Sequence, residues 1–218
     1  MRLIPVADGV LQLVLPPRRF INAYLVGDVL VDAGLKLHAG AIVKALSGHP
    51  VAAHVITHAH GDHAGGSRTV TTTLAVPAWC GAGDAGAVRA GEPVAASRVQ
   101  ALFGWQPVEV SRELRAGDEV GPGFEVLDVP GHSPGQIALW REHDRTLICA
   151  DVLMNLNFFT TLPGLNEPPG LFTVDPAGNR RAARRLAALE PRVVLFGHGR
   201  PLRDTAALAA FVASLSHD

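Results

Sequence analysis

The sequence predicts an α/β protein in which two β-sheets pack face to face and helices cover their outer surfaces. Segments typical of strands are followed by helical patterns, and this order occurs twice along the 218 residues. Apolar residues make up 48% of the chain and charged residues 18%, which supplies a substantial core. Because no short repeat or linker interrupts the pattern, we expect residues 1–218 to form one domain.

Three strands separated by short Pro- or Gly-containing turns open the first half: Val10 to Leu15, Phe20 to Val26 and Asp28 to Asp32. Apolar residues at positions 41, 42, 45 and 46 then indicate a helix, which ends before Pro50. Ala52 to Thr57 follows as a short buried strand. After it we expect a weak strand at Thr72 to Val76 and helical pieces at Ala85 to Ala90 and Ser97 to Leu102.

The second half begins with strands and ends with two helices. The candidate strands are Val108 to Val110, Phe124 to Val129, Gln136 to Trp140 and Thr146 to Cys149. Asp175 and Pro176 supply the N-cap and first-turn proline of a helix. Val193 to Phe196 is a last strand, and Asp204 caps a terminal helix whose apolar residues recur at helical spacing.

The charge balance argues against nucleic acid or an anionic membrane surface as a partner. The net charge is −1 and the isoelectric point about 6.8. Arginines at positions 180, 181, 184 and 185 could bind phosphate, but in so neutral a chain a solvated helix face is the simpler interpretation. We therefore expect a small-molecule substrate and a chain that acts as a monomer or homodimer.

The cysteines and the N-terminal residues predict a cytoplasmic protein. Cys80 and Cys149 lack the spacing of a zinc knuckle or a disulfide scaffold, so we expect two buried thiols. Asp8, Gly9 and Gln12 interrupt the early apolar residues, and no run is long enough to cross a membrane.

Four metal-ligand side chains lie within six residues after the strand at 52–57. They are His58, His60, Asp62 and His63 in the stretch Thr-His-Ala-His-Gly-Asp-His. His58 and His60 are two residues apart and project to the same side of an extended chain, and the backbone then turns at Gly61. A catalytic ion usually has about three protein ligands and an open position, so four ligands in one motif suggest a second ion.

Three later residues could supply the further ligands that a second ion needs. His132, Asp151 and His198 each follow an apolar strand in a turn, and glycines flank both histidines. Taken singly, a loop histidine is more often a surface residue, and Asp151 could be a helix cap. Together with the first motif they supply seven ligands, which is enough for two ions if Asp151 bridges them.

With these seven residues, the chain resembles the metallo-β-lactamase superfamily of metal-dependent hydrolases. Residues 57–63 match its signature, the three later ligands follow in the expected order, and Asp32 matches the Asp-x-Gly element after an early strand. The resemblance implies a four-layer αβ/βα sandwich of two mixed sheets with the site along one edge. It also implies that His58, His60 and His132 hold one ion, that Asp62, His63 and His198 hold the other, that Asp151 bridges them and that Asp32 orients a ligand histidine.

The activity expected from this resemblance is hydrolysis by a hydroxide shared between two divalent ions, with Asp62 taking a proton or orienting the hydroxide. Zinc is the first expectation, and iron and manganese also suit such ligands. Aspartate at position 151 favours the thioester-hydrolase (glyoxalase II-like) and lactonase branches, so an ester, thioester or lactone is the expected substrate. Only 20 residues follow His198, which is too few for the glutathione-binding extension of glyoxalase II.

Two alternatives keep the fold and change the reaction. One is a sulfur dioxygenase with a single iron, and the other is hydrolysis of a phosphodiester or a β-lactam. A third alternative, a metal-stabilised scaffold without activity, fits less well because structural zinc sites are usually closed shells of Cys and His.

The segment from Val152 to Thr173 has no clear period and many apolar residues, among them Met154, Leu156, Phe158, Phe159 and Leu162. It could form an apolar pocket wall, part of the core or a dimer contact. No function is assigned to the remaining histidines. We expect His38, His49, His143 and His217 at the surface and His54 facing either the core or the side opposite the motif.

Overall fold

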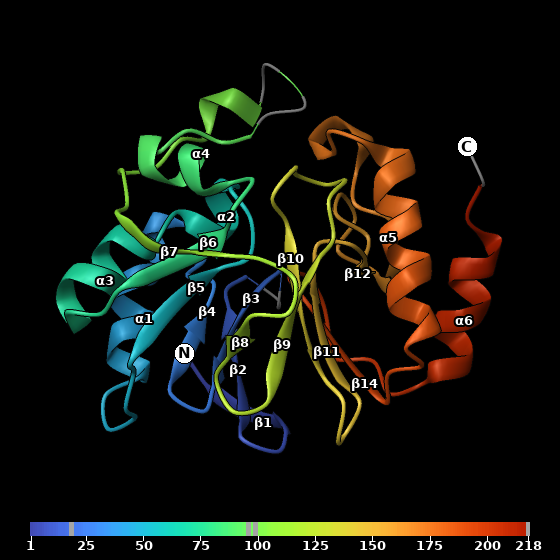
Figure 1. The fold of residues 1–218 in the computed structure, drawn as a ribbon, viewed down its shortest axis with the longest axis horizontal. Coiled ribbons are helices and arrows are strands. Elements are labelled where there is room, and N and C mark those ends of the chain that lie inside the picture. Colours follow the sequence, from blue (N-terminus) through green and yellow to red (C-terminus); the bar gives the residue numbers. More distant parts are fainter. Residues whose placement is uncertain (18–19, 95–96, 98–99, 217–218) are drawn as a thin grey trace.

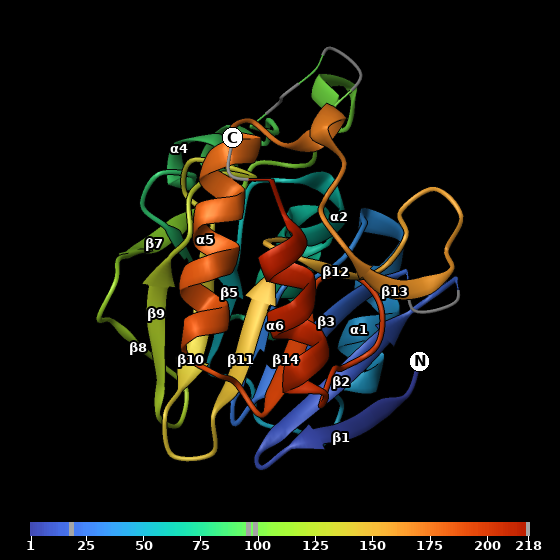
Figure 2. The ribbon, with the colours of Figure 1, turned by 90° about the vertical axis from the view of Figure 1, so that its right-hand side faces the viewer.

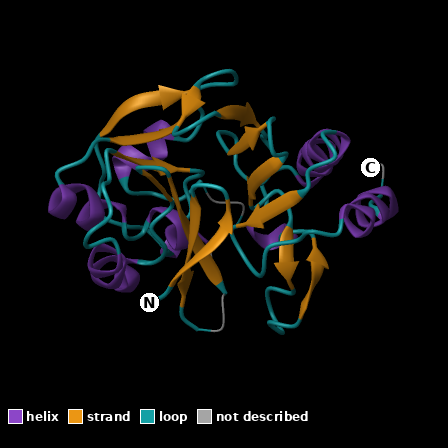
Figure 3. Cartoon of the chain, turned by 90° about the horizontal axis from the view of Figure 1, so that it is seen from below, coloured by secondary structure: helices purple, strands orange, loops and turns teal. Residues whose placement is uncertain are grey.

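The computed structural model describes residues 1–17, 20–94, 97 and 100–216, and these form a four-layer αβ/βα sandwich (Figure 1). Two mixed sheets pack against each other, with one group of helices outside the first sheet and another outside the second. Seen from below, most helices lie on two opposite sides of the molecule with strands between them (Figure 3). The predicted fold class is confirmed.

The first sheet has the strand order β1-β2-β3-β4-β5-β6-β7. Its strands are β1 (Leu3–Ala7), β2 (Val10–Leu15), β3 (Ile21–Val26), β4 (Val29–Val31), β5 (Ala53–Ile56), β6 (Ala78–Gly81) and β7 (Val110–Leu114). The first four strands are antiparallel, as in a meander, and β4 to β7 are parallel. The carboxyl ends of β4, β5 and β6 therefore lie at the same edge.

The second sheet has the order β14-β11-β10-β9-β8, and a short β12-β13 ribbon stands beside it. The strands are β8 (Glu119–Val120), β9 (Phe124–Asp128), β10 (Ile137–Arg141), β11 (Thr146–Ala150), β12 (Met154–Leu156), β13 (Pro163–Asn166) and β14 (Val193–Phe196). Strands β11 and β14 are parallel, so they too end at one edge.

Helices cover both outer faces. The helices that accompany the first sheet are, in chain order, η1 (Lys36–His38), α1 (Ala39–Ala45), α2 (Gly61–Ala64), α3 (Ser67–Leu74), α4 (Ala85–Ala90) and η2 (Gln100–Leu102). After β13 come η3 (Gly170–Phe172), α5 (Pro176–Ala188) and α6 (Thr205–Ser214), and α5 and α6 lie side by side over the second sheet (Figure 2). Among the described residues, no helix has both the length and the apolar character needed to span a bilayer.

The main core lies between the two sheets. Val31, Val55 and Tyr24 of the first sheet pack in one cluster with Leu139 and Leu195 of the second. Separate clusters of buried side chains fill the space between each sheet and its helices. This arrangement removes both faces of each sheet from water, which explains why β3, β5, β11 and β14 are buried at every position without alternation.

One expected strand is a helix. The sequence predicts a weak strand at Thr72 to Val76, but Thr72 and Leu74 belong to α3. The hydroxyls of Thr71 and Thr72 donate to the carbonyls of Ser67 and Arg68 four residues earlier, which satisfies them within the helix. The strand of this region is β6, which begins at Ala78. Of the expected helical piece at 97–102, residues 98 and 99 lie outside the described residues.

The arginines of α5 are used within the chain. Arg180 pairs with Glu167 at 2.7 Å, and Arg181 lies 3.3 Å from Asp175. The other two, Arg184 and Arg185, donate to backbone carbonyls. These contacts support the expectation of a solvated helix face.

Strand β3 ties the first sheet to the end of β14. Tyr24 donates its hydroxyl to the Phe196 carbonyl at 2.6 Å, and the Asn22 amide donates to the carbonyls of Phe196 and Gly199 at 2.9 and 2.8 Å. All three bonds are buried, so they have little competition from water. They hold the loop after β14 against the opposite sheet.

Replacing Tyr24 by Phe tests this tie. The variant removes one buried hydrogen bond but leaves the Phe196 carbonyl paired with Asn22, so we expect the free energy of unfolding to fall by about 1 kcal/mol. Urea denaturation followed by circular dichroism measures it. Ser111→Ala is the control: Ser111 is an exposed residue whose hydroxyl donates to the Ala78 carbonyl at 3.1 Å near the surface, and its loss should change stability by less than about 0.5 kcal/mol. Equal stability of Tyr24→Phe and the wild type would contradict the assignment.

Candidate metal centre

The seven predicted ligand residues lie on loops and on one short helix at one edge of the sandwich. His58 and His60 follow β5, and Asp62 and His63 belong to α2 directly after them. The remaining three come from the second sheet: His132 from the loop between β9 and β10, Asp151 from the end of β11 and His198 from the end of β14. The edge is formed by the carboxyl ends of the parallel strands, where ligands of α/β proteins usually bind.

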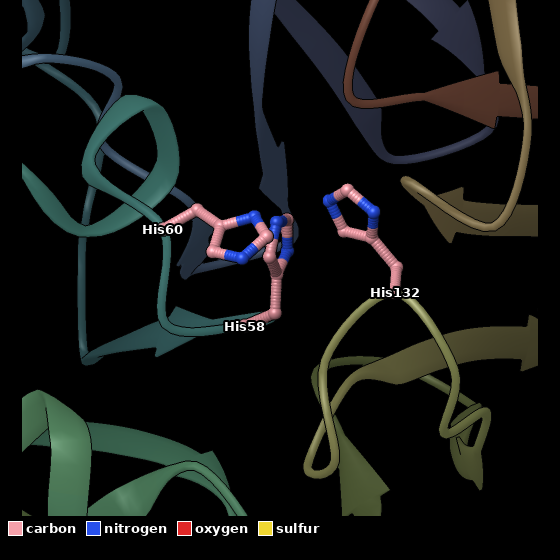
Figure 4. Close-up of side chains that lie close together, drawn as sticks. All are labelled: His58, His60 and His132. Atoms are coloured by element: carbon pink, nitrogen blue, oxygen red, sulfur yellow. The ribbon is translucent and has the colours of Figure 1, made fainter. Parts of the chain in front are cut away.

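His58, His60 and His132 form a first cluster. One nitrogen of each ring lies within 4.8 Å of the others, and the three rings converge from two separate loops (Figure 4). The opposite nitrogen of each ring contacts a neighbouring oxygen: His58 Nδ1 lies 3.0 Å from Thr57 Oγ1, His60 Nε2 lies 3.0 Å from the Val94 carbonyl, and His132 Nδ1 lies 3.1 Å from Thr173 Oγ1. Each ring is thus oriented from behind.

Asp62, His63 and His198 form a second cluster with the same spacing. Asp62 Oδ2 lies 3.2 Å from His198 Nε2 and 3.9 Å from His63 Nε2. The outer nitrogen of His63 lies 2.8 Å from Asp32 Oδ2, and that of His198 contacts the Phe20 carbonyl. Asp32 therefore stands where the sequence resemblance implies an orienting residue.

Asp151 lies between the two clusters. Its Oδ2 is 3.1 Å from His198 Nε2, 3.5 Å from His63 Nε2 and 3.7 Å from His132 Nε2. One carboxylate thus reaches ligands of both clusters, as a bridging ligand must.

Five inner atoms of this constellation are buried and make no well-aligned hydrogen bond among the described residues, although His63 Nε2 and His198 Nε2 lie beside the Asp151 carboxylate. The five atoms are His58 Nε2, His63 Nε2, His132 Nε2, His198 Nε2 and Asp151 Oδ1. Buried polar atoms are seldom left unpaired, because each costs about 1–3 kcal/mol. Imidazole nitrogens and carboxylate oxygens that converge in this way suit divalent zinc, iron or manganese. The residues present therefore fit metal ions.

The charges of the two clusters differ. Burial, and then the neighbouring histidines, lower the pKa of His58 well below its usual value, and burial with His60 lowers the pKa of His132 to about 3. The first cluster is therefore neutral. Burial alone would lower the pKa of His198, but Asp151 and Asp62 raise it to about 10. The second cluster is thus a place where two carboxylates attract positive charge.

Asp84 joins the two loops that carry the first cluster. Its buried carboxylate accepts hydrogen bonds from the Ala59 N–H at 2.8 Å, the Ser133 hydroxyl at 2.5 Å and the Gly135 N–H at 2.7 Å. Ala59 lies between His58 and His60, and Ser133 follows His132. Asp84 was not predicted as a site residue, although it follows a strand in a glycine-rich turn, the same setting as the later candidate ligands.

Two glycines allow the close approach of these loops. A Cβ at Gly197 would lie 2.0 Å from Asp151 Oδ1, and a Cβ at Gly135 would lie 2.0 Å from the Asp84 nitrogen. No side chain fits at either position, so the glycines beside the ligands are required by packing as well as by backbone bending.

Among the other histidines, His38 lies elsewhere than expected. His38 is buried, not at the surface, and its ring lies between the Leu35 N–H and the Pro16 carbonyl. His54 is also buried and contacts the Leu30 carbonyl and the Ser67 hydroxyl, and burial lowers its pKa to about 4. His49 and His143 are exposed, and His217 lies outside the described residues.

A cavity of about 300 Å³ opens onto the centre. His60, Asp62, His132 and Asp151 form its floor, and its walls are mainly apolar: Phe20, Leu35, Phe103, Met154, Phe158 and Phe172.

Only part of the 152–173 segment lines the cavity. Met154 and Phe158 line the cavity and Leu156 is buried, whereas Phe159 and Leu162 are 72% and 64% exposed. The segment is therefore a pocket wall in part.

Known proteins share this sequence pattern and this fold. The family model of the metallo-beta-lactamase superfamily matches residues 16–198. The probable metallo-hydrolase YflN of Bacillus subtilis is 28% identical over 201 residues, which cover 80% of this chain and 76% of YflN. The hydroxyacylglutathione hydrolase of Methylococcus capsulatus is 34% identical over 104 residues, which cover 47% of this chain and 34% of that enzyme.

A solved structure agrees. The protein TTHA1623 in a di-iron-bound form superposes with a TM-score of 0.67 at 28% identity, covering 91% of this chain and 96% of TTHA1623. With the family match over most of its length, the chain belongs to the metallo-beta-lactamase superfamily and is a metallo-hydrolase of that fold.

Proposed function

We propose that the chain holds two divalent ions and hydrolyses an ester, thioester or lactone bond of a small molecule. His58, His60 and His132 would hold the first ion, Asp62, His63 and His198 the second, and Asp151 would contact both. The observation that carries this proposal is the set of inner atoms without partners, because every ligand ring but His60 presents a buried, unpaired Nε2 to the centre.

The groups at the centre would have separate roles in hydrolysis. Two ions held there would lower the pKa of a shared water and stabilise the negative charge that develops on the substrate's carbonyl oxygen. The side chain of Asp62 faces the cavity and is 25% exposed, whereas that of Asp151 is 3% exposed, so we assign the proton of the attacking water to Asp62. The water oxygen bonds to the carbonyl carbon, the C–O or C–S bond breaks, and the proton passes to the leaving alcohol or thiol.

Two observations favour two ions over one. The seven side chains lie close together, and the second cluster concentrates two carboxylates and two histidines, a ligand set that a single ion at the first cluster would not use. TTHA1623, at 28% identity, is known in a di-iron-bound form. The single-iron dioxygenase alternative needs fewer ligands than the structure assembles.

The class of bond rests on the relatives. The hydroxyacylglutathione hydrolase of Methylococcus capsulatus matches nearly half of this chain, and its name denotes a thioester hydrolase. Aspartate, the residue of the thioester-hydrolase and lactonase branches, stands at 151 and reaches both clusters. These facts support an ester, thioester or lactone bond over a phosphodiester bond and over the amide bond of a β-lactam.

Replacing His60 by Ala tests the metal assignment. We expect loss of one ion per chain and a fall in hydrolysis of at least about a hundredfold, because an ion with two remaining histidines is weakly held. Elemental analysis of the purified protein, combined with assays on an ester, a lactone, a thioester and a phosphodiester, measures both. His143→Ala, an exposed histidine, is the control.

Full metal content and full rate in His60→Ala would contradict the assignment. One iron per wild-type chain with consumption of oxygen and no hydrolysis would instead favour the dioxygenase.

Replacing Asp84 by Asn tests the support behind the first cluster. A carboxamide offers one acceptor oxygen where three donors converge, so the loops of His58 to His60 and of His132 lose part of their common anchor. We expect metal affinity to fall about 10- to 100-fold while far-UV circular dichroism stays unchanged. Competition with a chromophoric chelator measures the affinity.

Asp118→Asn provides the matched control. Asp118 also accepts from a backbone N–H and a side chain, those of Arg115 and Arg112, but it lies in the turn between β7 and β8 and does not line the cavity. Equal metal affinity in Asp84→Asn and Asp118→Asn would show that Asp84 does not position the ligands.

A further inference from the structure

Aromatic rings form one wall of the cavity at the second cluster. The Phe158 ring lies centrally in this wall, with its centroid 5.0 Å from that of Phe20 and 5.3 Å from that of Phe172. Phe20 and Phe158 also lie 5.3 and 5.9 Å from the His198 ring. The aromatic wall therefore begins directly beside a candidate ligand, where the scissile group of a substrate would lie.

The polar groups of the cavity are concentrated on its floor. Apart from the candidate ligands, the polar side chain among the described lining residues is that of Gln100, whose amide lies 2.6 Å from His60 Nε2. No lysine or arginine occurs among those lining residues. A carboxylate group of a substrate would thus be desolvated against the aromatic wall without a cationic side chain from the described lining, which is costly.

The two sides of the cavity differ in the side chains that line them. Gln100, Pro93 and Phe103 belong to the segment beside His60, and the aromatic wall belongs to the segments beside His198. A substrate whose carbonyl lies over the floor therefore has one direction in which an apolar group finds continuous contact.

We infer that the substrate is an ester, thioester or lactone that carries an apolar acyl, alkyl or aryl group without a carboxylate, and that this group packs on Phe158 between Phe20 and Phe172. The inference rests on the hydrolase function proposed above and names its substrate class. Phe158 is the residue that determines specificity, because it contacts both neighbouring rings and lines the cavity.

The size of the cavity sets a limit on the group. Burial of one methylene contributes about 0.8 kcal/mol, which is about a fourfold gain in kcat/KM for each methylene added. A cavity of about 300 Å³ is at the small end of ligand pockets, so the gain stops once the wall is covered.

The first experiment measures binding without turnover. The neutral fluorescent probe N-phenyl-1-naphthylamine is titrated into the wild type, Phe158→Ala and Phe159→Ala. Phe159 is the adjacent residue but is 72% exposed and outside the cavity lining, so it is the matched control. We expect the Kd of the probe to rise about tenfold in Phe158→Ala and less than twofold in Phe159→Ala. Phe172→Ala provides a second variant if Phe158→Ala does not fold.

The second experiment measures kcat/KM of the metal-loaded protein for p-nitrophenyl esters with acyl chains of two to ten carbons, and for the same esters with a terminal carboxylate. We expect kcat/KM to rise with chain length, to be at least tenfold lower for the carboxylates, and to lose its chain-length dependence in Phe158→Ala. Equal rates along the series, or faster hydrolysis of the carboxylates, would overturn the inference.

The outcomes separate this inference from the proposed function. Hydrolysis without dependence on chain length or on Phe158 would leave the hydrolase and remove the apolar substrate class. Probe binding that depends on Phe158, with no hydrolysis of any ester, thioester or lactone by the metal-loaded protein, would keep the apolar site and remove the proposed reaction.

Discussion

The candidate centre depends on the alignment of the two sheets. The first sheet contributes four of the seven ligands and the second contributes three, so a slip of one sheet over the other would separate them. Two sets of buried hydrogen bonds oppose that slip. Tyr24 and Asn22 hold the end of β14, and Asp84 holds the loop of His132 to the loop between His58 and His60. Such bonds are directional, whereas the apolar packing between the sheets is not.

The same arrangement has a cost in the absence of ions. Several buried nitrogens and one carboxylate oxygen point inward without partners, and unpaired buried polar atoms destabilise the folded state. The four apolar clusters around the sheets must offset that cost. Ions that bind these atoms only in the folded chain would stabilise it by mass action, so metal binding and folding are coupled here.

The sequence pattern predicted correctly the strands and helix caps that depend on neighbouring residues. The strands at Val10 to Leu15 and Val193 to Phe196 are where the sequence places them, and Asp175 caps α5 as expected. The helix α3 was missed because its threonines bond to their own backbone, which composition does not reveal. Asp84 was missed because its partners Ser133 and Gly135 are 49 and 51 residues away in the sequence. Its role is defined by the contact between the loops, and no single segment contains that contact.

In the cavity, a polar floor lies directly beside an aromatic wall, and the wall strengthens electrostatic interactions at the floor. Charged and polar ligands form its floor, and rings such as Phe20 and Phe158 stand directly beside His198. Aromatic side chains exclude water, and electrostatic interactions are stronger where water is excluded. An apolar group that covers Phe158 would therefore do more than contribute its own burial. By displacing water next to the second cluster it would strengthen the attraction between the ligands and the charge that develops at the carbonyl, so the substrates that fill the wall best are also those whose bond breaking the centre can best assist.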